Sequence, residues 1–598
     1  MFQDFNVTAR PEQGPARLEK LRGGLKARGL DGFLVPRADA HQGEYVAPRD
    51  DRLAWLTGFT GSAGFCVVLS DIAGVFVDGR YRTQVKEQVA GCYTPVDWPE
   101  VLPGPWIVEH LGAGRVGFDP WLYTIGQLEA LQKAVAGTDI SFVPIANPID
   151  AIWEDQPDAP MAAVKAHPTD IAGESHAQKR TRLAAELSSA GHDAAVITLP
   201  DSIAWLLNIR GADIPRNPLA HGFAILNADA SVDLFMAEAK LAAVQDHLGA
   251  EVRIHDPAGF IAHLTKSSGT VRLDKASAPI AVQAAVAQSA AEIAYDQDPC
   301  VMPKARKNAA EIAGMVEAHL RDGAAVSTFL SWFDAQEKTA LTEIDVVRKL
   351  EDSRRATNAL LDISFDTIAG SGPHGAIMHY RVTEDTNRQL QEGELMVLDS
   401  GGQYADGTTD ITRTLPVGDV DTEVKVAFTR VLQGMIAVSR MRFPKGVAGS
   451  HIEAIGRLPL WMAGQDFDHG LGHGVGAYLC VHEGPQRLSR VSDVPLEAGM
   501  ILSNEPGYYR PGAFGIRIEN LIVVEEAPAL PGGDDHREML QFRTLTYTPI
   551  SRELIVPDML SADERDWLND YHATCRQLLS PRLAPEENVW LDGATAPL

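Results

Sequence analysis

The segment "DSGGQYADGTTDITRT", residues 399–414, places two aspartates where a pair of buried strands is expected. The apolar run "ELMVL" precedes Asp399, and β-branched residues surround Asp410, which we therefore expect inside the second strand. Glycines between them allow the chain to turn back, so a hairpin would bring both carboxylates to one face. Buried carboxylates repel each other and lose hydration unless positive charge lies between them. The segment therefore predicts a cation site at the end of a strand pair.

Turn chemistry is the simpler alternative for this segment. The pair Asp406-Gly407 would by itself explain a hairpin. It does not explain Asp410, which lies beyond the turn. A cation site is the interpretation that accounts for both strand-end aspartates.

Two further carboxylates occur in extended segments nearer the C-terminus. "GIRIENLIVV" (515–524) alternates regularly, which predicts one strand with Arg517 and Glu519 on the same face. Glutamate is depleted in strands, so this pair indicates a function, although an exposed edge strand would also carry it. Glu505 in "SNEPGYY" precedes Pro506, which favours extended backbone, although a surface turn would fit this position too.

Four histidines lie in short glycine-containing motifs of the same region. His379 ends "GPHGAIMH" (372–379), His469 and His473 lie in "HGLGHGVG" (469–476), and His482 lies in "VHEGP" (481–485). The glycines of "HGLGHGVG" disfavour a regular helix, so its two histidines do not form the helical H-E-x-x-H zinc motif. Glycines also let the backbone approach a site closely. A lone histidine is usually structural, but four in such motifs indicate a site.

The charges of these residues predict how many ions the site holds. Asp399, Asp410, Glu505 and Glu519 carry four negative charges, which two divalent cations would balance. Such ions would lower the pKa of a bound water. Ligands that are mostly carboxylates favour a hard or borderline metal such as Mn²⁺ over a thiolate-preferring ion.

Composition narrows the class of protein. The chain has 598 residues, with 53 Lys and Arg against 80 Asp and Glu, a formal net charge of −27. Such a surface repels nucleic acid and anionic membranes. Five dispersed cysteines without a C-x-x-C pair suit a reducing compartment. No signal peptide and no apolar run of membrane-spanning length is recognised, so we expect a cytoplasmic protein that binds neither nucleic acid nor membrane.

The first half of the chain repeats itself. "LKARGLDGFLVP" (25–36) parallels "LSSAGHDAAVITLP" (187–200), and "RLAWLTGFTG" (52–61) parallels "SIAWLLNIRG" (202–211). In each copy a helical pattern ends at glycine and an apolar strand ends at proline. The repeats predict two related α/β domains, although short matches of this kind also arise by chance.

The ordered set of motifs resembles the pita-bread metallopeptidases, most closely the three-domain cytosolic aminopeptidase P family. "DAHQGEYVAPRDDRLAWLTGFTGSAG" (39–64), "DSIAWLLNIRGADIPRNPL" (201–219) and "WLNDYHATCR" (567–576) extend the likeness over nearly the whole chain. The resemblance implies a fold of mixed α/β and α+β class: two related creatinase-like α/β domains followed by a pita-bread catalytic domain. We predict domains at 1–155, 156–302 and 303–540, with a C-terminal extension of the catalytic domain at 541–598.

The same resemblance implies roles for individual residues. The implied metal ligands are Asp399, Asp410, His473, Glu505 and Glu519. The implied catalytic residues are His379, His482 and Glu505, and the implied substrate-binding residues are His379, His469, His482, Tyr509 and Arg517. His374 departs from the family motif, which more often has another residue there, and an extra histidine would perturb the response to metal or pH.

The implied activity is removal of the first residue from peptides with proline at the second position, by a homodimer with two Mn²⁺ ions per site. Proline lacks an amide N–H and has a fixed φ, so a shaped pocket can recognise it. A prolidase acting on dipeptides is one alternative. A non-enzymatic pita-bread protein that binds peptides or histones is another, and a metal-free creatinase is a third. The full set of candidate ligands argues against the last two.

Overall fold

The computed structural model of the protein describes residues 1–534 and 536–598. The chain forms two compact units: an N-terminal unit, Thr8–Val301, and a C-terminal unit, Met302–Leu598 together with Met1–Val7. The first seven residues, which the sequence placed in the first domain, thus pack with the C-terminal unit. There the buried Gln3 side chain donates to the Thr367 carbonyl at 3.3 Å and accepts from its amide at 2.8 Å. Among the described residues, no helix is long and apolar enough to cross a membrane.

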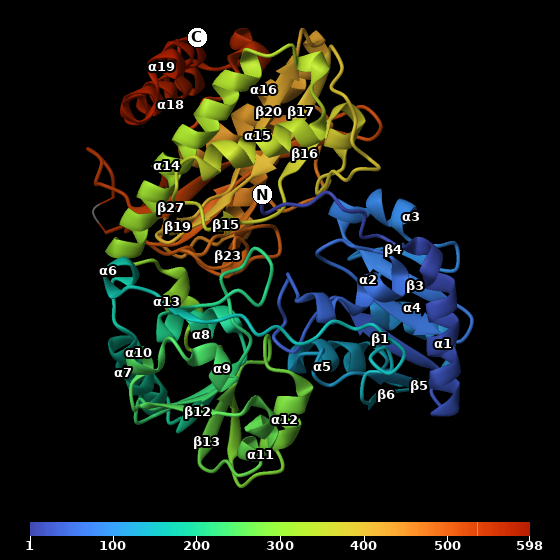
Figure 1. The fold of residues 1–598 in the computed structure, drawn as a ribbon. Helices are drawn as coiled ribbons and strands as arrows, with labels where there is room; N and C mark the ends of the chain where they lie inside the picture. Colours follow the sequence, from blue (N-terminus) through green and yellow to red (C-terminus); the bar gives the residue numbers. More distant parts are fainter. Residues whose placement is uncertain (535) are drawn as a thin grey trace. The chain divides into compact units, whose positions relative to one another are not determined.

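The N-terminal unit contains two six-stranded mixed sheets of identical topology, coloured blue and green in Figure 1. The first has the order β4-β3-β2-β1-β5-β6, with strands β1 (Gly32–Pro36), β2 (Phe65–Leu69), β3 (Ala73–Val77), β4 (Thr94–Asp97), β5 (Ala113–Phe118) and β6 (Asp139–Pro144). The second has the order β12-β11-β10-β8-β13-β14, with strands β8 (Ala194–Ile197), β10 (Phe223–Asn227), β11 (Val232–Phe235), β12 (Val252–His255), β13 (Thr270–Leu273) and β14 (Glu292–Tyr295).

Corresponding strand pairs have the same direction in both sheets. The β1–β2 and β8–β10 pairs are antiparallel, whereas β1–β5 and β8–β13 are parallel. The repeated tryptophans lie on equivalent helices, Trp55 on α2 (Arg52–Thr57) and Trp205 on α8 (Pro200–Leu207). These correspondences confirm the predicted pair of related α/β domains.

Both faces of the first sheet are covered by helices because its strands are apolar on both sides. Phe33 and Val35 pack under α1 (Gly14–Ala27) and α2, while Leu34 packs under α4 (Pro103–Leu111) and α5 (Ile125–Ala134). Successive strand residues point to opposite faces, so a continuous apolar run suits a sheet buried on both sides.

The described residues of the C-terminal unit form four sheets. The three-stranded sheet β16-β17-β20 consists of β16 (Ile368–Ser371), β17 (Glu394–Ser400) and β20 (Ile411–Val417). The six-stranded sheet β21-β28-β27-β24-β22-β23 consists of β21 (Arg442–Pro444), β22 (Gly472–Gly474), β23 (Glu483–Leu488), β24 (Ile501–Asn504), β27 (Asn520–Glu526) and β28 (Met539–Thr544). Two small sheets complete it: β15 (Asp362–Ile363) with β18 (Gly402–Tyr404) and β19 (Gly407–Thr408), and β25 (Gly507–Arg510) with β26 (Phe514–Arg517).

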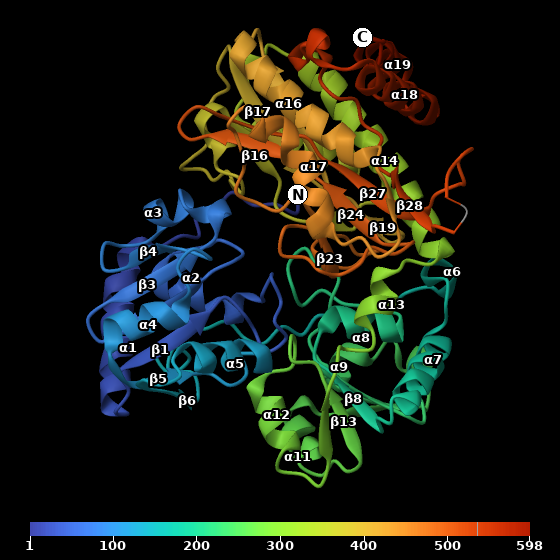
Figure 2. The same cartoon turned by 180° about the vertical axis from the view of Figure 1, so that it is seen from behind.

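Two helix pairs cover these sheets. Helices α14 (Ala309–Asp334) and α15 (Glu343–Arg355) share one apolar core with β16, β17 and β20. Helices α16 (Thr422–Ser439) and α17 (Gly449–Trp461) lie side by side over the six-stranded sheet (Figure 2) and share another core with it. Helices α18 (Ala562–Leu579) and α19 (Pro585–Ala594) add apolar residues to this second core, so the C-terminal segment is an integral part of the unit.

Candidate metal centre

Asp399 and Asp410 lie at neighbouring ends of two paired strands. Asp399 is near the end of β17, directly opposite Thr412 of the antiparallel β20. Asp410 immediately precedes β20, so the prediction that it lies inside the strand is wrong by one residue. The strand starts late because the intervening chain forms its own hairpin, β18–β19, in a different sheet. Both carboxylates are buried, with 8% and 3% of their residues' surface exposed.

Glu519 lies at a break between two strands, which corrects the prediction of one continuous strand over 515–524. Strand β26 ends at Arg517 and β27 begins at Asn520. Between them the Glu519 amide donates to the Thr412 carbonyl at 3.1 Å, so the chain leaves one sheet for another at this point. The Thr412 hydroxyl donates to Glu519 Oε2 at 2.7 Å, which orients the carboxylate next to the β17–β20 pair.

His473 and Glu505 are joined through Ser503. The Ser503 hydroxyl accepts from the His473 amide at 2.9 Å and donates to Glu505 Oε1 at 3.1 Å. His473 lies on the short strand β22, as the glycine-rich motif predicted when it excluded a helix. A Cβ atom at Gly472 would lie 2.0 Å from the Ser503 carbonyl oxygen, so only glycine permits this close approach.

The side chains converge on one buried position. Ligand atoms of Asp410, His473 and Glu519 all lie within 4.8 Å of one another. His473 Nε2 is 3.5 Å from Asp410 Oδ2 and 3.5 Å from Glu505 Oε1. Among the described residues, the buried Asp399 Oδ1 has no hydrogen-bond partner. Such an oxygen is expected where a cation binds, because a buried acceptor without a partner is costly.

Electrostatics show that the cluster is unfavourable without positive charge. Burial and the charge of Asp399 raise the pKa of Asp410 well above its ordinary value. Burial and the charges of the neighbouring carboxylates do the same to the pKa of Glu519. Burial also raises the pKa of Glu505, although His473 and Arg517 oppose this shift. A divalent cation would favour the charged form of every carboxylate.

A hydrogen-bonded chain runs from Asp399 away from the cluster. Arg517 donates through Nη2 to Asp399 Oδ2 at 2.6 Å and through Nη1 to the Tyr509 hydroxyl at 2.7 Å. His469 Nε2 lies 2.9 Å from the same hydroxyl. Burial raises the pKa of Tyr509 to about 12 despite the nearby guanidinium, so the phenol stays protonated at neutral pH. Three predicted substrate-side residues therefore connect to one predicted ligand.

The other two predicted histidines lie in separate segments: His482 directly precedes β23, and His379 lies in a turn of another segment. The ring of His482 lies 4.2 Å from that of His473 in an edge-to-face arrangement. His379 is half-buried in the turn after the 3₁₀ helix η6 (Gly372–Ala376). This segment packs tightly on the β25–β26 hairpin, where a Cβ atom at Gly515 would lie 1.7 Å from the Gly375 carbonyl oxygen.

Sequence reasoning missed a buried ion cluster behind His482. The next residue, Glu483, is fully buried and binds Lys304 Nζ at 3.0 Å and Lys307 through a closer contact. Glu483 pairs with Gly474 across the β22–β23 ladder, adjacent to His473. Lysine and glutamate are usually surface residues, and Lys307 lies 176 residues before Glu483 in the chain, so no local pattern identifies this cluster.

A second missed residue, Glu343, supports the turn that carries His379. Its fully buried carboxylate accepts from the Ser371 amide at 2.8 Å and from the Tyr380 hydroxyl at 2.9 Å. His374 Nδ1 lies 3.0 Å from both carboxylate oxygens. The unusual histidine therefore braces its own loop. Glu343 lies in the first turn of α15, where an acidic residue suits the helix dipole. That position explains the residue from sequence alone, so its hydrogen bonds to the turn of His379 could not be predicted.

Arg413 is a third missed residue. Its buried guanidinium donates to the Glu519 carbonyl at 2.7 Å and to the Tyr571 hydroxyl of α18 at 2.9 Å. It also donates to the carbonyls of Thr548 at 2.7 Å and Pro549 at 3.0 Å. The C-terminal segment is thereby tied to the strand break that positions Glu519.

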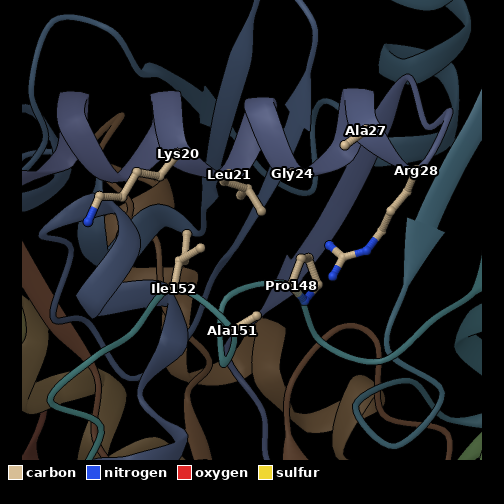
Figure 3. A pocket seen from close by; sticks show the side chains of 8 residues that line it. All are labelled: Lys20, Leu21, Gly24, Ala27, Arg28, Pro148, Ala151 and Ile152. Carbon is tan, nitrogen blue, oxygen red and sulfur yellow. The ribbon is translucent and has the colours of Figure 1, made fainter.

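A shallow pocket in the N-terminal unit is not a competing site. It lies between α1 and the chain segment 148–152, which comes after β6 (Figure 3). Its lining offers two cationic side chains, Lys20 and Arg28, and otherwise aliphatic groups. It has no carboxylate or imidazole and therefore no set of metal ligands.

Profiles of known families cover nearly the whole chain. Metallopeptidase family M24 matches residues 313–526, and the C-terminal region of that peptidase family matches 538–598. The creatinase/prolidase N-terminal domain matches twice, at 17–152 and 155–311. These matches define the class of the protein: M24 metallopeptidases with two creatinase-type N-terminal domains.

Individual relatives are similar over most of their length. A probable Xaa-Pro aminopeptidase P of Coccidioides posadasii is 38% identical, with 95% of this chain and 90% of that protein aligned. Aminopeptidase P2 of Arabidopsis thaliana is also 38% identical, over 95% of this chain and 86% of that protein. The protein therefore belongs to the Xaa-Pro aminopeptidase P family.

Solved structures agree with this assignment. The X-prolyl aminopeptidase of Caenorhabditis elegans, described as a cytosolic enzyme with a di-nuclear active site, superposes with a TM-score of 0.92 at 32% identity, over 98% of this chain and all of that one. The prolidase of Pyrococcus horikoshii covers only 62% of this chain, with a TM-score of 0.50 at 24% identity, and shares the fold alone.

Proposed function

We propose that the protein is a dinuclear metallo-aminopeptidase that releases the first residue from peptides with proline at the second position. The proposal rests on one observation above all: ligand atoms of Asp410, His473 and Glu519 converge within 4.8 Å in a buried place. Full-length similarity to proteins named aminopeptidase P supports the substrate class.

The ligand set that we propose has five members, Asp399, Asp410, His473, Glu505 and Glu519. The unpartnered Asp399 Oδ1 and the raised pKa values of Asp410 and Glu519, caused first by burial, fit two bound divalent cations. Four carboxylates and one imidazole suit a borderline ion, and we propose Mn²⁺. When bound, such ions supply an activated water and polarise the scissile carbonyl.

The protein's own groups then hold and move protons around the reacting carbonyl. Glu505, oriented by the Ser503 hydroxyl at 3.1 Å, takes the proton of the attacking water. His482 and His379 donate hydrogen bonds to the substrate oxygen as its charge develops, which favours the transition state over the bound peptide. Arg517 holds Asp399 through a charge-assisted hydrogen bond of 2.6 Å.

The selection of the peptide's end follows from the same ligand set. A neutral N-terminal amine would add a nitrogen donor to this site, whereas an acetylated one would not. The proline ring would occupy the next position, against Tyr509 and His469, whose polar atoms lie 2.9 Å apart. Proline has no backbone N–H, so its burial in that pocket leaves no hydrogen-bond donor without an acceptor.

The alternatives receive less support. A prolidase-type dipeptidase shares the fold over only 62% of this chain. A metal-free creatinase or a non-enzymatic binding protein has no need of five convergent ligands. We further propose a cytoplasmic location and a homodimer formed through the C-terminal unit, which native mass spectrometry of the full chain would test.

Three matched peptides test the substrate class: one with a free Xaa-Pro terminus, its N-acetylated form, and the same peptide with alanine in place of proline. Mass spectrometry over time should show loss of one residue from the first only, with severely reduced kcat/KM for the alanine peptide. Equal turnover of all three would refute a proline-directed aminopeptidase. Turnover of none by metal-loaded protein would favour the non-enzymatic alternative.

A further inference from the structure

A second group of potential metal ligands lies entirely within the N-terminal unit. Asp39 and Asp50 follow β1 in the first α/β domain, and His221 precedes β10 in the second. One ligand atom from each lies within 4.8 Å of the other two. None of these residues belongs to the centre described above.

Among the described residues, one oxygen of the buried Asp39 carboxylate has no hydrogen-bond partner. The residue is 1% exposed, and its Oδ1 accepts from the amides of His41 at 2.9 Å and Gly43 at 3.1 Å. Its Oδ2 lies 3.2 Å from His221 Nε2, yet within the described residues neither atom has a partner in hydrogen-bond geometry. Two ligands about 2.1 Å from a tetrahedral ion lie roughly 3.4 Å apart, so this separation suits two ligands of one cation.

The local charge also calls for a cation. Asp50 Oδ1 accepts from Arg52 at 3.0 Å, but the same guanidinium binds Asp150 at 2.7 Å and is therefore shared. A divalent ion would balance the two carboxylates.

The imidazole of His221 is held in place before any ion arrives. Its backbone amide donates to Asp213 at 2.7 Å, and its carbonyl accepts from Lys240 at 3.0 Å. Its ring stacks on that of His41, with centroids 4.7 Å apart. His41 Nδ1 in turn lies 3.0 Å from the Thr198 carbonyl, which fixes the stacking partner. These contacts limit the movement of the His221 ring.

An ordinary histidine–aspartate pair in the same unit looks different. His255 Nε2 makes an aligned hydrogen bond of 2.7 Å to Asp233 Oδ1. Arg253 binds both oxygens of Asp233 at 2.8 and 2.6 Å. That carboxylate is satisfied by direct partners, whereas the oxygen that Asp39 turns towards His221 is not.

We propose that Asp39, Asp50 and His221 bind one divalent cation of the Zn²⁺ or Mn²⁺ type, with water completing its coordination. One nitrogen and two oxygen donors suit a borderline metal, and three protein ligands leave a position for water. Because the ligands come from both α/β domains, the ion joins the two halves of the N-terminal unit. The site is structural and does not depend on the proposed peptidase activity.

Ion counting on variants of the full chain tests this site. Wild type, His221→Gln, Asp50→Asn and the matched control His255→Gln are dialysed against Zn²⁺, or against Mn²⁺ in a parallel series, and analysed for metal content and thermal unfolding. We expect His221→Gln and Asp50→Asn to hold one ion fewer per chain than wild type. They should also lose part of the metal-dependent rise in Tm, whereas His255→Gln keeps both.

The comparison is a difference between variants, so it does not depend on how many ions the catalytic centre holds. Circular dichroism checks that each variant folds. If His221→Gln does not fold, the metal content of Asp50→Asn tests the proposed site. Wild-type ion content in both variants, with an unchanged response of Tm to metal, would overturn the proposal. Asp39 and His221 would then form an ordinary ion pair.

Discussion

Arg517 donates a hydrogen bond of 2.6 Å to Asp399 while its other terminal nitrogen donates to the Tyr509 hydroxyl at 2.7 Å. A single guanidinium thus connects a proposed metal ligand to the residues proposed to hold proline. The fork geometry is specific to arginine, because lysine offers a point charge that cannot reach two acceptors in fixed directions.

Arg517→Lys should therefore impair the enzyme while it preserves the charge. We expect kcat/KM to fall about 10- to 100-fold, the usual effect of removing a group that orients a ligand. Steady-state kinetics with an Xaa-Pro peptide measures this. Arg510→Lys, on the same hairpin and paired with the exposed Glu423, is the control. Equal kinetics for the two variants would show that the fork is unimportant.

Tyr509→Phe isolates the hydroxyl that joins Arg517 to His469. The ring and its packing remain, but both hydrogen bonds are lost. We expect a loss in kcat/KM of about tenfold, because one hydrogen bond to a charged group contributes roughly 1.5–3 kcal/mol. The neighbouring Tyr508→Phe, which packs against the apolar core, should stay near wild type. Unchanged kinetics for Tyr509→Phe would contradict the proposed link.

Glu483→Gln tests the buried cluster behind His482. The substitution leaves the ammonium groups of Lys304 and Lys307 buried without a counter-charge, so we expect unfolding to become easier by about 3–5 kcal/mol. Glu497→Gln removes the exposed partner of Arg306 in the same segment and should cost under about 1 kcal/mol. Chemical denaturation of both measures the difference. Similar losses would mean that the buried cluster contributes no more than a surface pair.

The metal-free protein should have an unusual dependence on pH. Burial raises the folded-state pKa of Asp410 and Glu519. Their contribution to stability is fully present below the ordinary carboxyl pKa of about 4 and is lost as the pH rises through the raised values. Metal binding displaces these protons, so affinity should strengthen with rising pH.

Two measurements follow. Thermal unfolding in chelator should show Tm falling as the pH rises through the raised pKa values, with a smaller fall in metal-loaded protein. Calorimetry in two buffers of different ionisation enthalpy should detect proton release on metal binding. Binding without proton release, or weaker at higher pH, would contradict the electrostatics of the cluster.

The carboxylates and histidines of the centre could be predicted from the sequence because each lies in a short local motif. The break between β26 and β27 could not be predicted, because the alternation of side chains continues through Ile518 while the partner strand changes. Pairing between distant strands decides that break. Glu343, Glu483 and Arg413 were missed for the same reason: a charged residue indicates surface until its distant buried partners are known.

Asp410→Asn tests the central claim most directly, with metal content and cleavage of an Xaa-Pro peptide measured on the same sample. Asp406→Asn, on the adjacent hairpin and paired with Arg321, is the matched control. We predict that Asp410→Asn carries about two ions fewer per chain than wild type and cleaves no peptide, while Asp406→Asn keeps both metal and activity. Cleavage at the wild-type rate by Asp410→Asn, or wild-type metal content in it, would refute the proposed dinuclear centre.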